Sequence, residues 1–171
     1  MSAPPERARE VLEARARALA RPLAAPRSQE TVPLVTFALA GETYGIAASH
    51  VLGIFRLVDM APLPGATAPV AGVTAWRGEL LLILDLRRPL GLPVDGLDDL
   101  AWAIALGREG AEFGLLAQKV NELVQVAATD IGTPAQGVAA DRAYLRGITR
   151  DAVLVLDADA LLRMPHWGGS L

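Results

Sequence analysis

Apolar and polar residues alternate where the main part of the chain begins. Apolar residues occupy every second position from Val35 to Leu39, and residues 44–47 repeat this after a turn at 41–43. A period of two predicts β-strands with one buried face. Residues 50–57 continue in β-branched and aromatic side chains, so we expect a third strand there, after a short bend.

A hairpin is the clearest element of the pattern. Two apolar segments, residues 70–76 and 80–86, are joined by Arg77-Gly78-Glu79. The five consecutive apolar residues Leu80–Leu84 predict a strand that is buried on both faces rather than a helix, which would be longer. Gly78 supplies the backbone angles that a tight hairpin connection requires.

The same order of segments recurs in the second half of the chain. Residues 44–55, YGIAASHVLGIF, align without a gap with residues 113–124, FGLLAQKVNELV. Residues 72–74 are echoed by 147–149, and residues 82–85 by 154–157. Two copies of one β module predict two similar small barrels. Each copy alone, at roughly 65 residues, would bury little surface, so we expect the copies to share an apolar seam.

The repeat also sets the expected domain organisation. We predict a domain at 31–164, with repeat halves at about 31–98 and 99–164, and a short tail at 165–171. Residues 1–30 differ in composition and predict an amphipathic helical extension, with Leu12, Leu19 and Leu23 at helical spacing among arginines. This helix packs weakly on the domain, stays partly free, or docks on a partner. Pro22, Pro26 and Pro33 mark the boundary.

Composition excludes several classes of function. The chain has 171 residues, a formal net charge of −3 and no cysteine. A protein that binds mainly nucleic acid concentrates positive charge, so we expect no nucleic-acid partner. The lack of cysteine removes thiol chemistry and cysteine-ligated zinc. No apolar run reaches the length of a membrane-spanning helix, so we expect a cytoplasmic protein without direct membrane insertion.

Residues that could carry catalysis do not form a recognisable set. His50 and His166 are the only histidines and lack metal-ligand spacing. Asp85 and Asp157 each follow an apolar run and are best interpreted as strand-end residues that accept hydrogen bonds from nearby backbone N–H groups. We therefore expect no catalytic residue, no metal and no cofactor. An enzyme built on a double β-barrel is the competing hypothesis, which a bound metal or nucleotide would favour.

Trp76 and Arg77 stand at the hairpin end. Their residue types dominate binding hot spots, although a tryptophan that caps the core beside a solvated arginine fits the sequence equally well. Gly53 and Gly72 would let another backbone or helix approach closely.

Two stretches carry a family resemblance. FALAGETYGIAASHVLGI and PLPGATAPVAGVTAWRGELLLILDLRRPLG resemble the CheW-like family of bacterial chemotaxis coupling proteins, over about residues 35–162. The most specific part combines Gly72-Val73, Arg77-Gly78 and Asp85-Leu86-Arg87. The resemblance implies a mainly β fold of two SH3-like five-stranded barrels around a joint hydrophobic core. It also implies a non-catalytic adaptor that joins the CheW-like regulatory domain of a CheA-like histidine kinase to the cytoplasmic tip of a methyl-accepting chemoreceptor.

The resemblance further implies where a receptor would bind. The groove between the barrels would hold a receptor helix against a set of six residues, namely Val51, Ile54, Gly72, Val73, Trp76 and Arg77. Any membrane association would be indirect, through receptor arrays. The chain departs from the family at Gly53, where a glutamate is usual, at Trp76, where a leucine is usual, and at Leu82, where a proline is common. The departures leave an alternative open, in which a specialised member binds a single partner or recruits another protein through its N-terminal helix.

Overall fold

The computed structural model describes residues 10–11, 13–15, 29–97, 99–133 and 142–164. The chain divides into two units, Met1–Glu30 and Thr31–Leu171. Residues 10–11 and 13–15 of the first unit are helical. The rest of the predicted helical extension up to residue 28 and the predicted tail at 165–171 lie outside the described residues. Pro33, which we expected at the boundary, instead lies inside the first strand, opposite Gln125.

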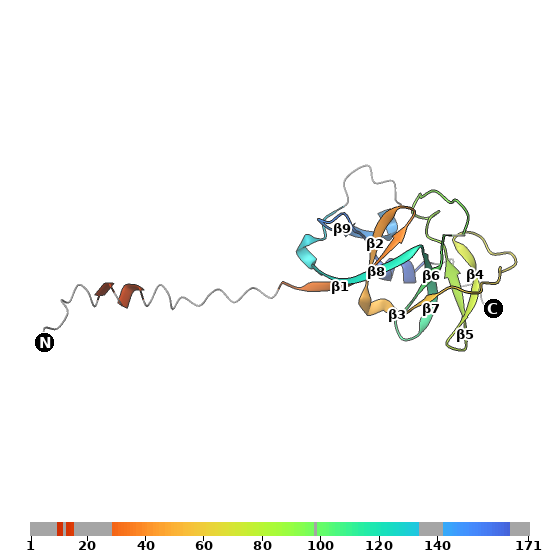
Figure 1. The fold of residues 1–171 in the computed structure, drawn as a ribbon, viewed down its shortest axis with the longest axis horizontal. Coiled ribbons are helices and arrows are strands. Elements are labelled where there is room, and N and C mark those ends of the chain that lie inside the picture. Colours follow the sequence, from red (N-terminus) through yellow and green to blue (C-terminus); the bar gives the residue numbers. More distant parts are fainter. Residues whose placement is uncertain (1–9, 12, 16–28, 98, 134–141, 165–171) are drawn as a thin grey trace. The chain divides into compact units, whose positions relative to one another are not determined.

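Strands dominate the second unit (Figure 1). In chain order they are β1 Thr31–Leu39, β2 Glu42–Ala47, β3 Val51–Arg56, β4 Val70–Trp76, β5 Glu79–Leu84, β6 Trp102–Gly107, β7 Ala111–Ala117, β8 Lys119–Ala127, β9 Leu145–Ile148 and β10 Leu154–Leu156. The described helical segments of this unit are short: η1 Ala48–His50, η2 Ala128–Asp130, η3 Arg142–Tyr144 and α2 Ala158–Leu162.

The strands form two five-stranded sheets of identical design. The first, called here the β1 sheet, has the order β8-β1-β2-β10-β9, and the second, the β6 sheet, has the order β3-β6-β7-β5-β4. Exchanging β1–β5 with β6–β10 converts one order into the other. The parallel pairings agree residue by residue with the sequence repeat, because Val155 lies opposite Gly45 as Ile83 lies opposite Gly114.

The two halves of the repeat exchange strands. A tandem repeat suggests one barrel for each half, but each sheet combines two strands of one half with three of the other. The exchange arises where β3 leaves β2 through η1 and pairs with β6, and where β8 follows β7 and pairs with β1. Figure 1 shows the second exchange, with β8 (cyan) beside β1 (orange). The halves therefore interlock, which lets short modules build a common core.

Each sheet closes on itself at an equivalent place. Ala61, which follows β3, pairs with Val73 of β4 through two backbone hydrogen bonds of 2.9 Å. Gly132, which follows β8, pairs in the same way with Ile148 of β9. These pairings join the two edges of each sheet, so both sheets curve into small barrels.

The barrels share one hydrophobic core. Its members come from both sheets, for example Phe37 and Tyr44 from β1 and β2, and Leu106 and Phe113 from β6 and β7. Phe37 and Tyr44 stack with ring centroids 6.0 Å apart. The predicted fold, two five-stranded barrels around a joint core, is confirmed.

The β4–β5 hairpin corrects one expectation. Leu80 was predicted to be buried with its four apolar neighbours, but it is 73% exposed, whereas Leu81 and Ile83 point inward. At the hairpin end only one face of β5 packs against the core, so alternate residues of the strand face solvent there. The turn itself is Arg77-Gly78, because Glu79 already belongs to β5.

Candidate partner-binding surfaces

Trp76, at the end of β4, packs against β3. Its ring stacks on Phe55 with centroids 6.1 Å apart and an interplanar angle of 29°. It also covers the backbone of Gly53, where an added Cβ would lie only 2.7 Å from Cζ2 of the tryptophan. Because β3 and β4 are the two edges of the β6 sheet, Trp76 helps to close this barrel.

Arg77 lies directly on this tryptophan. The guanidinium carbon is 4.4 Å from the centroid of the Trp76 ring, a cation–π geometry. Arg77 has φ 50° and Gly78 has φ 84°, so the two-residue turn has left-handed angles at both positions. Arg77 is exposed, and no ion pair of Arg77 occurs among the residues that the structure describes. The result is a positioned cation at the hairpin tip.

Ile54 is an exposed aliphatic residue of β3. It pairs across strands with Ile104, which is fully buried, yet Ile54 itself is 42% exposed. Its repeat equivalent on β8, Leu123, is 60% exposed. Val51 lies on the same strand as Ile54 and is partly buried against the core. Both edge strands therefore present an aliphatic side chain to solvent.

Gly72 and Val73 belong to a different surface. A Cβ on Gly72 would lie 2.5 Å from the carbonyl oxygen of Ala61, so the space beside Gly72 is filled by the chain's own backbone rather than open to a partner. Val73 lines a shallow groove of about 400 Å³. We call it the Val58–Leu80 groove, after its two most exposed apolar residues, at 85% and 73%.

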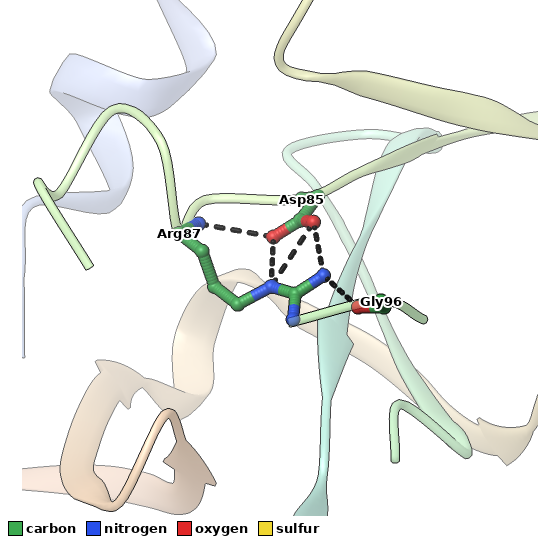
Figure 2. Close-up of polar contacts among 3 residues, drawn as sticks. All are labelled: Asp85, Arg87 and Gly96. Atoms are coloured by element: carbon green, nitrogen blue, oxygen red, sulfur yellow. Dashed lines mark hydrogen bonds and ion pairs between the residues drawn. The ribbon is translucent and has the colours of Figure 1, made fainter. Parts of the chain in front are cut away.

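Asp85 and Arg87 form a buried ion pair behind the hairpin (Figure 2). Nη2 of Arg87 donates to Oδ2 of Asp85 at 2.7 Å and to the carbonyl oxygen of Gly96 at 2.6 Å, and Nε donates to both carboxylate oxygens. The backbone N–H of Arg87 donates to Oδ1 at 3.0 Å, which confirms that Asp85 bonds the backbone at a strand end. Hydrogen bonding to Asp85 raises the pKa of Arg87 above its ordinary value. The pair ties the loop that follows β5 to Gly96.

The described residues contain neither a cluster of metal-ligating side chains nor a membrane-spanning helix. Within the described ranges, no group of three or more His, Asp or Glu side chains could hold a metal ion. No helix among these residues is long and apolar enough to cross a membrane.

Comparison with known proteins identifies the family of this chain. A family model described as CheW-like domain matches residues 33–166. The chain belongs to the CheW-like family. It is 29% identical over 144 residues to a chemotaxis protein CheW from Treponema pallidum (strain Nichols), covering 78% of this chain and 84% of that protein. It is 26% identical over 108 residues to a chemotaxis protein CheW from Bacillus subtilis (strain 168), covering 63% of this chain and 69% of that protein.

A solved structure shares the fold. The chain superimposes on the scaffolding protein TtCheW from Thermoanaerobacter tengcongensis with a TM-score of 0.66 and 23% sequence identity, covering 75% of this chain and 90% of that one. The match supports the CheW-like arrangement of two joined barrels.

The six predicted site residues of this CheW-like chain do not form one cluster. Val51 and Ile54 lie on β3, and Trp76, which carries Arg77, packs on Gly53 and Phe55 of the same strand. Ile54 stands between these two residues, so its side chain points to the other face of β3. Gly72 and Val73 are part of the barrel closure and of the Val58–Leu80 groove.

The sequence analysis did not identify Val58 and Leu80 as exposed apolar residues of a candidate partner surface. The signal for Leu80 was its place beside the hairpin turn, but the apolar run around it suggested burial.

Proposed function

We propose that this chain is a non-catalytic adaptor that couples a methyl-accepting chemoreceptor to a chemotaxis-type histidine kinase. The match of the CheW-like family to residues 33–166 carries this proposal. Two relatives that bear the name chemotaxis protein CheW support it. In this role the chain works in the cytoplasm and reaches the membrane only through receptor arrays.

The receptor tip would bind at the β3 surface. We place it across β3, against exposed Ile54 on one face of the strand and the stacked pair Trp76 and Arg77 at the hairpin end, because an aliphatic side chain, an aromatic ring and an arginine are the residue types of a binding hot spot. A helical receptor hairpin presents apolar and charged side chains on one face, which suits this surface.

The regulatory domain of the kinase would bind at the Val58–Leu80 groove. Val58 and Leu80 are the two most exposed large apolar residues in the described part of the chain, and both line this groove. Burying them against a partner would remove apolar surface from water at about 25 cal/mol per Å². The two surfaces adjoin at Phe55, which stacks on Trp76 and lines the groove. A movement of one bound partner can therefore be transmitted to the other through the contact between Phe55 and Trp76.

Separate disruption of the two surfaces tests the proposal. The probes are a purified cytoplasmic tip fragment of a methyl-accepting chemoreceptor and the regulatory domain of a chemotaxis-type histidine kinase from the same organism. Ile54→Asp should weaken receptor binding at least tenfold and leave kinase binding unchanged, and Leu80→Asp should do the reverse, since a charge in a buried contact costs over 1.4 kcal/mol.

Val94→Asp is the matched control, because Val94 is 41% exposed and lies on neither surface. Failure of the wild-type chain to retain either probe would contradict the adaptor function. Retention of one probe alone would favour the specialised single-partner member.

A further inference from the structure

Gly53 and Trp76 form a steric pair. The tryptophan ring occupies the space where a side chain at position 53 would begin, with only 2.7 Å between Cζ2 and an added Cβ. Contacts of that length do not occur between real atoms of this kind, so a larger residue at 53 and the tryptophan at 76 exclude each other unless one moves.

The barrel of the β1 sheet supplies an internal comparison. Its equivalent of Gly53 in the sequence repeat is Glu122, on β8. The hairpin there is shorter, since β9 ends at Ile148 and the chain already turns through Thr149 and Ala152. The described part of that hairpin has no counterpart of Trp76. Where the tryptophan is missing, a full side chain stands at the glycine position.

Trp76 also fixes the cation at the hairpin tip. Arg77 would otherwise sample many rotamers, and its left-handed backbone is strained for a residue that has a Cβ. Stacking on the indole at 4.4 Å restricts the guanidinium while leaving it exposed. An arginine held by an aromatic face loses less entropy when it binds a carboxylate.

We infer, on the basis of the proposed receptor binding, that Trp76 is a positioning residue and Arg77 a specificity determinant. Together they select receptor tips that place an acidic side chain opposite the hairpin end. The carboxylate that pairs with Arg77 then comes from the partner rather than from position 53 of this chain.

Arg77→Asn separates binding from folding. Asparagine accepts left-handed angles, and Asn-Gly is the favoured pair for this turn, so the urea midpoint should not fall. Affinity for the receptor tip fragment should fall about tenfold, which corresponds to about 1.4 kcal/mol. Added salt should weaken the wild-type complex more than the variant complex, because an exposed charge pair is screened.

Trp76 variants test the positioning role. Trp76→Phe keeps an aromatic face under Arg77 and should retain most of the affinity, whereas Trp76→Leu should lose affinity, though no more than Arg77→Asn does. The double variant Trp76→Leu with Arg77→Asn should bind no worse than Arg77→Asn alone, because Trp76 acts on the partner only through Arg77. An additive loss would overturn the positioning role.

The steric exclusion between a side chain at position 53 and Trp76 is tested by unfolding in urea. Gly53→Ala should lower the urea midpoint of the wild-type chain but not that of the Trp76→Leu chain. Equal loss in both backgrounds would show that the glycine is required for another reason.

The acidic partner is identified by charge reversal. Each Asp and Glu of the receptor tip fragment is changed to Lys in turn, and the one that pairs with Arg77 should lose binding to the wild-type chain and regain it with Arg77→Glu. If the wild-type chain binds the fragment but Arg77→Asn binds equally well, this inference fails while the adaptor function stands. If the wild-type chain does not bind the fragment, the proposed function itself fails.

Discussion

The two barrels share one plan but differ at their hairpins. Strand order, parallel register and the bridge that closes each sheet are the same in both. The β4–β5 hairpin, however, has strands of 7 and 6 residues, whereas β9 and β10 have 4 and 3. Trp76, Arg77 and Leu80 all belong to the longer hairpin. The duplicated part thus builds the framework, and the extension of one hairpin adds Trp76, Arg77 and Leu80 to the candidate surfaces.

The strand-end aspartates differ in a parallel way. Asp85 follows β5 and pairs with buried Arg87. Asp157 follows β10 and accepts a 2.9 Å hydrogen bond from the backbone N–H of Ala160, so it caps α2. Both confirm the interpretation of strand-end residues that bond the backbone, but only the first also holds a buried arginine.

The largest expected effect is the loss of this arginine. Arg87→Ala should lower the free energy of unfolding by about 3 kcal/mol, because it leaves the Asp85 carboxylate without its partner in a poorly solvated site. Asp157→Ala is the matched change in the other barrel and should cost about 1 kcal/mol, the typical value of an N-cap. Urea denaturation of both variants measures the difference. Equal losses would contradict the distinction between the two aspartates.

The glycines at the closing bridges should behave alike. A Cβ on Gly72 or on Gly147 would lie 2.5 Å from the facing carbonyl oxygen, of Ala61 or Gly132 respectively. Gly72→Ala and Gly147→Ala should each cost about 2 kcal/mol by overpacking. A bulky residue at Gly72 therefore tests the fold before it tests binding.

Gly110→Ala is the control for both, since nothing lies within 4 Å of an added Cβ there. Thermal or urea unfolding that spares one of the two bridge glycines would show that the barrels close differently.

Tyr44→Phe makes the first copy match the second, which has Phe113 at the equivalent position. The hydroxyl of Tyr44 donates to Oε2 of Glu42 at 2.6 Å, so its removal should cost about 1 kcal/mol. Burial, and then the hydrogen bond to Glu42, raise the pKa of Tyr44 above its ordinary value of 10.0.

A tyrosine whose pKa is raised by folding stabilises the folded state at pH values below its unfolded pKa. This contribution to stability is lost as pH rises through the pKa of the folded state. The wild-type chain should therefore lose stability above about pH 10 more steeply than Tyr44→Phe, as measured by denaturation at a series of pH values. Identical pH dependence in the two proteins would contradict the role of the buried phenol.

The smallest effect concerns Asp159, which stands beyond the second strand-end aspartate. Nη2 of Arg108 donates to its Oδ1 at 2.6 Å, and Nε2 of His50 lies 3.6 Å from the same oxygen. Hydrogen bonding to Arg108, then the charges of His50, Arg108 and Arg163, hold the pKa of Asp159 below its ordinary value of 3.8.

A carboxyl group whose pKa is lowered by folding stabilises the folded state at pH values above its unfolded pKa. This contribution to stability is lost as pH falls through the pKa of the folded state. The group is half exposed, so we expect only a slight change in stability. Carboxyl NMR titration should show the pKa of Asp159 rising in Arg108→Ala, with Arg163→Ala as the weaker comparison. An unchanged titration in both variants would contradict the assignment.

Much of the fold could be predicted from sequence because the repeat is local and ungapped. The extent of β4 and the paired positions of Gly45 and Gly114 follow from period and alignment. The exchange of strands between halves could not be predicted, since it depends on which sheet β3 joins after η1, and the apolar pattern of β3 suits either.

The candidate site was less accessible to sequence reasoning. The contact of Trp76 with Gly53 joins residues that are distant in sequence and lie on opposite sheet edges, and no periodicity reports such a contact. Leu80 was taken for a core residue because a run of leucines does not reveal where one covered face ends. The ion pair of Asp85 with Arg87 was also not predicted, because Asp85-Leu86-Arg87 was interpreted only as part of the family pattern.

The exchange of strands has a consequence for biosynthesis. A ribosome must deliver β10 before the β1 sheet is complete, and β7 before the β6 sheet is complete. A chain interrupted after β7 therefore has every strand of the β6 sheet, whereas its β1 sheet still lacks β8, β9 and β10.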